Sequence, residues 1–144
     1  MLRPYVLPDT GAVLQIWLDA SVQAHHFVPR AFWEGQLEAM RTVYLPASET
    51  FVFERHATVE GFISLLGETV AALFVAPASQ GMGIGSRLLE YAKQRSARLE
   101  LKVYSANESA VAFYQRSGFS IVASGEDEHT GATELTLQWL AATP

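Results

Sequence analysis

A glycine-rich segment near the middle of the chain constrains the fold more than any other feature. Residues 80–86 read Gln-Gly-Met-Gly-Ile-Gly-Ser. The apolar run Thr69–Val75 precedes them, and a stretch with helical spacing of apolar residues, about 83–96, follows. A strand, a glycine-rich turn and a helix start together present bare backbone N–H groups to an anion such as phosphate. The sequence therefore predicts an anionic ligand at this turn.

Two known phosphate-binding motifs do not fit this segment. A Walker P-loop ends in Gly-Lys-Ser/Thr, and residues 80–86 contain no lysine. A dinucleotide-binding fold needs an acidic residue at the end of the next strand, which here ends in Val103-Tyr104. The glycines have a physical role all the same. Gly81 and Gly83 permit positive φ, and Gly85 permits close approach of a ligand to the first helical turn.

The rest of the chain predicts an α/β fold with a mixed sheet. Helices are expected after a cap at Asp9 or Thr10 and at about 31–42, 83–96 and 108–117, where Asn107 is the N-cap and Gly118 ends the last one. Strands are expected at 2–6, 51–55, 58–66, 69–75, 99–104, 119–123 and 133–140. Strands 58–75 pair antiparallel, and the two helical crossovers in the second half call for parallel pairing.

Composition excludes several classes of function. A chain of 144 residues is expected to be one domain, residues 1–144, and its net charge of -5 argues against a nucleic-acid partner. Cysteine is absent, so there is no thiolate nucleophile, thiolate metal site or disulfide. No apolar run approaches the length of a membrane span, and no signal-peptide layout is seen. We therefore expect a cytoplasmic protein without a membrane partner.

Two blocks of the sequence resemble the GNAT superfamily of acyl-CoA-dependent N-acetyltransferases. Gln80-x-x-Gly83-x-Gly85 is similar to the pyrophosphate signature of that superfamily, and Asn107-x-x-Ala110-x-x-Phe113-Tyr114-x-x-x-Gly118-Phe119 resembles its second block. The resemblance spans the chain and is nearest to small single-domain bacterial members with an Ala/Thr-His-x-Phe segment, here Ala24–Phe27. It implies a GNAT fold, in which about seven strands of a mixed sheet are flanked by about four helices. The sheet is splayed between the fourth and fifth strands.

The resemblance also implies acetyl-CoA as co-substrate and a primary amine as acceptor. Tyr114 would be the general acid, because a tyrosine hydroxyl stays protonated at neutral pH and can donate to the departing thiolate. A strand N–H near Phe74 or Val75 would stabilise the oxyanion. Attack is expected to be direct, in a ternary complex, since no cysteine can carry an acyl group. The implied cofactor-binding residues are Leu73, Phe74, Val75, Gln80, Gly81, Met82, Gly83, Ile84, Gly85, Ser86, Asn107, Ala110 and Phe113.

Two residues are candidates for the general base. His25 adjoins His26 in an expected linker before Pro29, where a solvated polar pair is the simpler interpretation. Glu68 is the residue just before the central strand, where a turn residue after Gly67 is the simpler interpretation. The histidines lack the spacing and carboxylate companions of a metal site, so no metal is expected.

The acceptor is the least determined part of the sequence. Trp17, Phe27, Phe32 and Trp33 fit either an acceptor pocket or the core, and the acidic run 126–128 fits either a solvated hairpin tip or an attractor for a cationic acceptor. A metabolite amine and a protein lysine both stay open, as does a homodimer. The alternative function is a non-catalytic acyl-CoA-binding sensor or regulatory module, which would keep the glycine loop without an acid or base.

Overall fold

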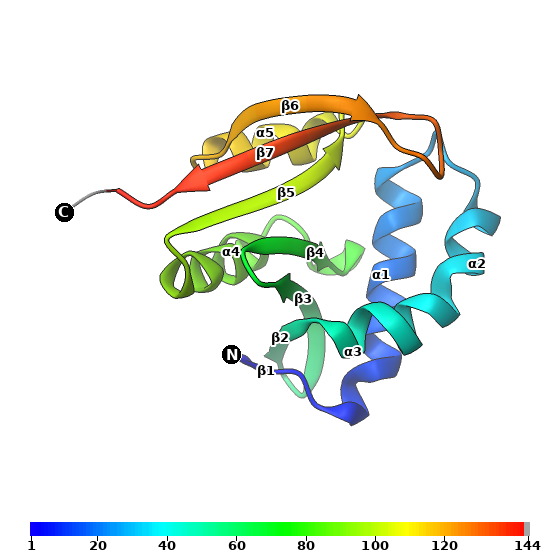
Figure 1. Ribbon diagram of the computed structural model, residues 1–144. Helices are drawn as coiled ribbons and strands as arrows, with labels where there is room; N and C mark the ends of the chain where they lie inside the picture. Colours follow the sequence, from blue (N-terminus) through cyan, green and yellow to red (C-terminus); the bar gives the residue numbers. More distant parts are fainter. Residues whose placement is uncertain (143–144) are drawn as a thin grey trace.

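The computed structural model describes residues 1–142 and shows a twisted sheet with helices on both faces (Figure 1). The strands are β1 (Leu2–Pro4), β2 (Glu49–Arg55), β3 (Thr58–Leu66), β4 (Thr69–Val75), β5 (Arg98–Tyr104), β6 (Ser120–Glu126) and β7 (Thr133–Leu140). The α-helices are α1 (Thr10–Ala24), α2 (Arg30–Ala39), α3 (Leu45–Ala47), α4 (Ile84–Arg95) and α5 (Glu108–Arg116). Three short helical turns join them: η1 (Leu7–Asp9), η2 (Met40–Tyr44) and η3 (Pro77–Ser79).

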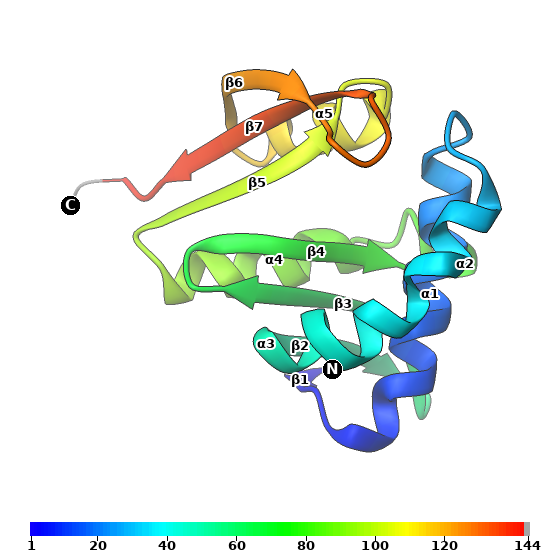
Figure 2. The ribbon, with the colours of Figure 1, turned by 45° about the vertical axis from the view of Figure 1, so that its right-hand side comes forward.

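The sheet is divided near its middle. Its order is β1-β2-β3-β4-β5-β7-β6, and all neighbours are antiparallel except β4 and β5. The parallel β4–β5 ladder consists of one residue pair, Thr69 with Glu100. From there the two strands diverge toward their C-terminal ends (Figure 2). The predicted mixed, splayed sheet is therefore confirmed.

The turns of the first half follow from local sequence. His56 and Ala57 both adopt positive φ, 54° and 62°, in the two-residue turn between β2 and β3. Gly67, with φ 61°, makes the turn into β4. Because these turns are short, β3 and β4 each return beside the preceding strand, as the sequence predicts.

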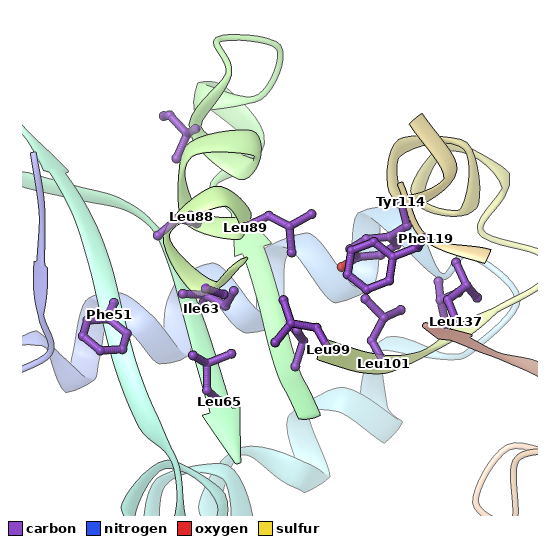
Figure 3. Packing of buried hydrophobic residues seen from close by; sticks show 14 of the residues in the cluster. Phe51, Ile63, Leu65, Leu88, Leu89, Leu99, Leu101, Tyr114, Phe119 and Leu137 are labelled. Atoms are coloured by element: carbon purple, nitrogen blue, oxygen red, sulfur yellow. The ribbon is translucent and has the colours of Figure 1, made fainter. Parts of the chain in front are cut away.

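One core layer lies between the sheet and the pair α4 and α5. The predicted apolar face of α4 is buried, with Leu88 and Ala92 wholly inaccessible to solvent. Figure 3 shows side chains from α4 and the sheet meeting there, with Tyr114 beside Phe119 at one end. A second layer, under α1 and α2, centres on Val13 and on Phe62 of β3. The region where β4 and β5 part lies between these two core layers.

Several details differ from the sequence-based expectation. The helix expected at 31–42 is α2 followed by the π-helical turn η2, and its buried residues are Trp33 in α2 and Met40 in η2. Asp9 does not cap α1 with its side chain, because its carboxylate is held by Arg3 at 2.8 Å and by the Val6 N–H at 2.9 Å. The second crossover does not create a parallel pair. Strand β7 inserts between β5 and β6 and pairs antiparallel with both.

None of the helices within residues 1–142 is both long and apolar enough to cross a membrane.

Candidate functional site

A cleft of about 780 Å³ opens where β4 and β5 part, and we call it the cofactor cleft. It lies between the end of β4, the glycine-rich loop and the N-terminal part of α5. Its lining residues are Ala20, Gln23, Ala24, Leu73, Phe74, Val75, Ser79, Gln80, Gly81, Gly83, Ile84, Gly85, Ser86, Ala106, Asn107, Glu108, Ser109, Ala110, Phe113, Tyr114 and Arg116. Twelve of the thirteen residues that the sequence assigns to cofactor binding are among them. Residues of the glycine-rich segment and of the segment that begins at Asn107 therefore line the same cleft.

The glycine-rich loop presents a helix N-terminus to this cleft. Gly81 and Gly83 both have a φ of 81°, and Gly83 is the left-handed N-cap of α4. The first N–H groups of α4 have no partner within the helix, and its first turn contains no acidic side chain. The helix dipole therefore adds to these donors in favouring an anion.

Gly85 lies against side chains of α5 and β4. A Cβ at this position would lie 3.5 Å from Cζ of Phe113 and 3.7 Å from Cγ2 of Val75. The neighbour of the first helical turn is thus the Phe113 ring, which seats α5 against α4. These are ordinary van der Waals distances, so a methyl group would fit at Gly85, and the close approach of a ligand to this turn stays a prediction.

The edge of β4 that faces the cleft carries backbone groups that do not pair with a neighbouring strand. The Ala76 N–H donates to the Glu60 carbonyl across to β3 at 2.8 Å, and the antiparallel register continues with Phe74 opposite Phe62. Alternation along a strand then directs the N–H and C=O groups of Leu73 and Val75 away from β3, toward the gap. A ligand arm could pair with them as an added strand does.

Two glutamines join the cleft to α1. The Gln80 side-chain amide donates to the Val75 carbonyl at 3.2 Å and to Oε1 of Gln23 at 2.9 Å. The sequence gives no signal for the role of Gln23, because the two residues are far apart in the chain and Gln23 lies on the exposed side of α1. This bridge holds the start of the glycine loop over the end of β4.

Asn107 caps α5 at the opposite wall of the cleft. Its side-chain oxygen accepts a hydrogen bond from the Ala110 N–H at 3.3 Å, as predicted for an N-cap. Both residues line the cofactor cleft. The cap therefore fixes the helix that carries Phe113 and Tyr114.

Tyr114 lies between the cofactor cleft and a second cavity. That cavity, of about 230 Å³, runs along β4 and β5 beneath α1, and we call it the central chamber. Tyr114 lines both spaces and is buried, which raises the pKa of its hydroxyl well above the ordinary value. The hydroxyl is therefore protonated at neutral pH and remains able to donate a proton.

The central chamber collects unpaired polar atoms. Within residues 1–142, three buried side-chain atoms lack a hydrogen-bond partner: Oγ of Ser21, Nδ1 of His25 and Nε1 of Trp33. All three residues line this chamber. Buried polar atoms are normally paired, so their gathering indicates a space that receives a polar group or water.

His25 is not solvated, contrary to the simpler interpretation of the sequence. It ends α1 as the C-cap, and its ring packs against Phe27, Trp33 and Tyr104 at centroid distances of 5.7, 5.1 and 5.1 Å. Burial lowers the pKa of His25 below its ordinary value of 6.5, so the ring is neutral at pH 7. His26, in contrast, is exposed.

This burial predicts a pH dependence of stability. The unfolded chain binds a proton at His25 more readily than the folded chain, so the free energy of unfolding should fall as pH drops below about 6.5. The loss due to His25 has an upper limit of about 1.4 kcal/mol per pH unit. Urea denaturation between pH 7.5 and 5 should therefore show a shallower pH slope for His25→Phe. The matched control is His26→Ala, and equal slopes for wild type and His25→Phe would contradict the prediction.

A third cavity, the outer pocket, adjoins the chamber on the side away from the cofactor cleft. It has a volume of about 310 Å³ and is walled by aromatic side chains of α1, α2, η2 and β5. Its lining includes Trp17, Phe32, Trp33, Met40, Tyr44, Tyr104, Asp127 and His129. Trp17, Phe32 and Trp33 thus belong to both the second core layer and a pocket wall. Phe27 packs on His25 and does not line the outer pocket.

Asp127 is the member of the acidic run that turns inward. The Tyr104 hydroxyl donates to its Oδ2 at 2.5 Å, and the Thr130 hydroxyl donates to the same oxygen at 2.9 Å. Burial alone would raise the pKa of this carboxyl, but these bonds outweigh it and the pKa is lowered. Burial and the bond to Asp127 together raise the pKa of Tyr104 to about 12. The carboxylate is therefore ionised and held at the pocket wall.

Two predicted site residues lie apart from these cavities. Glu68 is exposed in the turn at the far end of β4, where Arg98 approaches its carboxylate at 3.8 Å. The structure does not bring it near Tyr114. Met82 is 47% exposed, and its sulfur meets the Arg55 guanidinium at 3.6 Å instead of lining the cleft. The sequence assigns Met82 to cofactor binding because it lies within the glycine-rich loop, but its side chain points away from the cleft.

Comparisons with known proteins agree with this geometry. A family model described as "Acetyltransferase (GNAT) domain" matches residues 46–121. The chain is 33% identical over 140 residues to the peptidyl-lysine N-acetyltransferase YiaC of Escherichia coli K12, covering 96% of each chain. It is 34% identical over 121 residues to the peptidyl-lysine N-acetyltransferase YjaB of the same strain, covering 83% of this chain and 81% of that protein.

Solved structures show the same fold. The solution structure of apo YjaB from Escherichia coli superposes with a TM-score of 0.85 at 26% identity, covering 99% of this chain and 98% of that one. The PaiA N-acetyltransferase of Thermoplasma acidophilum, solved with coenzyme A, has a TM-score of 0.80 at 14% identity, with coverage of 97% and 98%.

Proposed function

The chain belongs to the GNAT family of acyl-CoA-dependent N-acetyltransferases, and from this premise we propose that it acetylates the ε-amino groups of lysine side chains in proteins. The observation that carries the proposal is the row of three adjoining cavities along β4. The central chamber shares Tyr114 with the cofactor cleft and shares Trp33 and Tyr104 with the outer pocket. Donor and acceptor can thus approach the same tyrosine from opposite sides. The named activity of the relatives YiaC and YjaB supports lysine as the acceptor.

Acetyl-CoA fills the cofactor cleft in this proposal. The N–H groups of residues 81–86 at the start of α4 bind the pyrophosphate. The pantetheine arm pairs with Leu73 and Val75 on the free edge of β4, between that strand and α5. Asn107, Ala110 and Phe113 form the facing wall. The coenzyme-bound neighbour of the same fold supports this choice of co-substrate.

The chemistry then requires an oxyanion donor and an acid. The lysine nitrogen attacks the thioester carbonyl, the new C–N bond forms and the C–S bond breaks. The Leu73 N–H is the oxyanion donor we assign, because alternation along β4 turns the Phe74 N–H toward β3 and the Val75 N–H, nearer the glycine loop, pairs with the pantetheine arm. Tyr114 protonates the departing thiolate of CoA. No acyl-enzyme forms on a cysteine, since the sequence has none.

His25 is the residue we assign to the amine proton. Its neutral ring borders the chamber that Tyr114 also borders, so it can accept a proton there directly or through one water. Because Glu68 lies at the far end of β4, we assign it no catalytic role. We also propose that residues 1–144 act as one N-acetyltransferase domain, because strands from both ends of the chain belong to one sheet.

The test is an acetylation assay with lysine peptides. Peptides with a blocked N-terminus and a single lysine, incubated with acetyl-CoA, should release free thiol and gain one acetyl group on the lysine. A peptide with arginine in place of lysine is the control. Thiol release with small amines but with none of the peptides or folded protein substrates would overturn the lysine proposal. Tight acetyl-CoA binding without transfer to any amine would favour the non-catalytic alternative.

A further inference from the structure

The outer pocket has the composition of a cation site. Its walls include the aromatic side chains of Trp17, Phe32 and Tyr104, and aromatic rings attract ammonium groups. Asp127 is the carboxylate among the residues that line it; no lysine or arginine stands among them, and His129 is the one basic side chain there. A carboxylate without a lysine or arginine partner, beside aromatic rings, favours an occupant with one positive charge and an apolar stem.

The path from this pocket to the cofactor cleft is short. Ala71 and Ala72 line the outer pocket, and Leu73, which carries the oxyanion donor assigned above, lines the cofactor cleft. At about 3.3 Å of rise per residue, the strand from Ala71 to Leu73 covers roughly 7 Å, about the reach of an extended lysine side chain. An amine attached directly to a peptide backbone outside the pocket therefore cannot reach the thioester, whereas an amine on a long unbranched stem can enter.

The unpaired polar atoms of the central chamber lie along that path. Trp33 lines both cavities, and its Nε1 is buried without a partner. Ser21 and His25 contribute the other two unpaired atoms. A neutral imidazole and a hydroxyl can each accept a hydrogen bond from an amine that has moved from Asp127 into the central chamber.

From these observations, and resting on the proposed lysine acetylation, we infer that Asp127 and the outer pocket select the acceptor by charge and by length. Asp127 attracts the ammonium group, the aromatic walls hold the methylene stem, and the amine reaches the chamber only when the stem has the length of a lysine side chain. The enzyme thereby discriminates against shorter side-chain amines and against the α-amino group of an N-terminus.

The length rule is tested with peptides that differ in one side chain. Wild-type kcat/KM is measured for blocked peptides with lysine, ornithine or 2,4-diaminobutyrate at one position, and for a lysine-free peptide with a free N-terminal alanine. We expect a loss of about tenfold for each methylene removed, with the N-terminal amine slowest. Equal values for lysine and ornithine would overturn the inference and leave lysine acetylation standing. Should no peptide be acetylated, n-pentylamine, n-propylamine and ethylamine test the same length rule on small acceptors.

The charge rule is tested with Asp127→Asn and its neighbour Glu128→Gln. The asparagine oxygen still accepts the Tyr104 hydrogen bond, so the pocket wall is kept while its charge is lost. We expect KM for the lysine peptide to rise about tenfold with kcat nearly unchanged, and the salt dependence of KM to become weaker. Glu128 is exposed on the same turn and does not line the pocket, so Glu128→Gln should leave both quantities near wild type. Equal behaviour of the two variants would overturn the role of Asp127, and unchanged acetyl-CoA affinity verifies the fold.

Discussion

Replacement of Tyr114 by phenylalanine is expected to lower kcat by about 10²-fold or more, the range usual for a lost general acid. The ring contacts with Phe113 and Phe119, at 5.2 and 5.6 Å, are kept in the variant, so acetyl-CoA affinity should change little. Because the raised pKa keeps the hydroxyl protonated, wild-type kcat should not fall through loss of this proton between pH 7 and 9. Free-thiol release at saturating acetyl-CoA measures both effects.

The matched control for this variant is Tyr91→Phe. Tyr91 is a tyrosine of α4 that packs on Phe51 and lines none of the three cavities. Its substitution removes the same hydroxyl chemistry from another part of the protein. Wild-type turnover in Tyr114→Phe, or an equal loss in Tyr91→Phe, would show that Tyr114 is not the acid.

Substitution of Gly83 by valine is expected to weaken acetyl-CoA binding by roughly 10–100-fold. Gly83 has a φ of 81°, where a β-branched residue is strained, and relief of that strain would turn the first N–H groups of α4 away from the cleft. The loss of one or two charge-assisted hydrogen bonds to the pyrophosphate gives an effect of this size. Isothermal titration with acetyl-CoA measures it directly.

Gly67→Val separates this effect from general destabilisation. Gly67 also has positive φ, 61°, and open space around its Cα, but it lies in the β3–β4 turn, outside the cofactor cleft. It should lower the stability of the fold and leave acetyl-CoA affinity unchanged. If both variants bind acetyl-CoA as the wild type does, the glycine loop does not hold the pyrophosphate.

Local signals account for the parts of the fold that the sequence predicts well. The β2–β3–β4 meander depends on short turns at His56-Ala57 and Gly67, and the buried face of α4 follows from its own periodicity. The insertion of β7 between β5 and β6 has no such signal. Strand order there depends on side chains from distant segments that must share one core, and no spacing along the chain records it.

The same distinction applies to the site. The glycine loop and the Asn107 cap are contiguous motifs, so the sequence locates them. The burial of His25 depends on Trp33 and Tyr104, and Asp127 is drawn inward by the Tyr104 hydroxyl. Nothing in the residues next to His25 or Asp127 distinguishes them from their exposed neighbours His26 and Glu128. The acceptor side therefore becomes visible only when tertiary contacts are known.

The single pair that joins β4 to β5 has a consequence for the energetics of the whole molecule. Apart from Thr69 and Glu100, the two halves of the sheet are not joined by a ladder, and the free edge at Leu73 and Val75 stays open. A pantetheine arm bonded to that edge would act as the missing strand between the halves. Bound acetyl-CoA would then raise the free energy of unfolding, because a ligand that binds only the folded chain shifts the unfolding equilibrium toward that state. The concentration of acetyl-CoA would therefore affect the stability of the folded enzyme as well as its turnover rate.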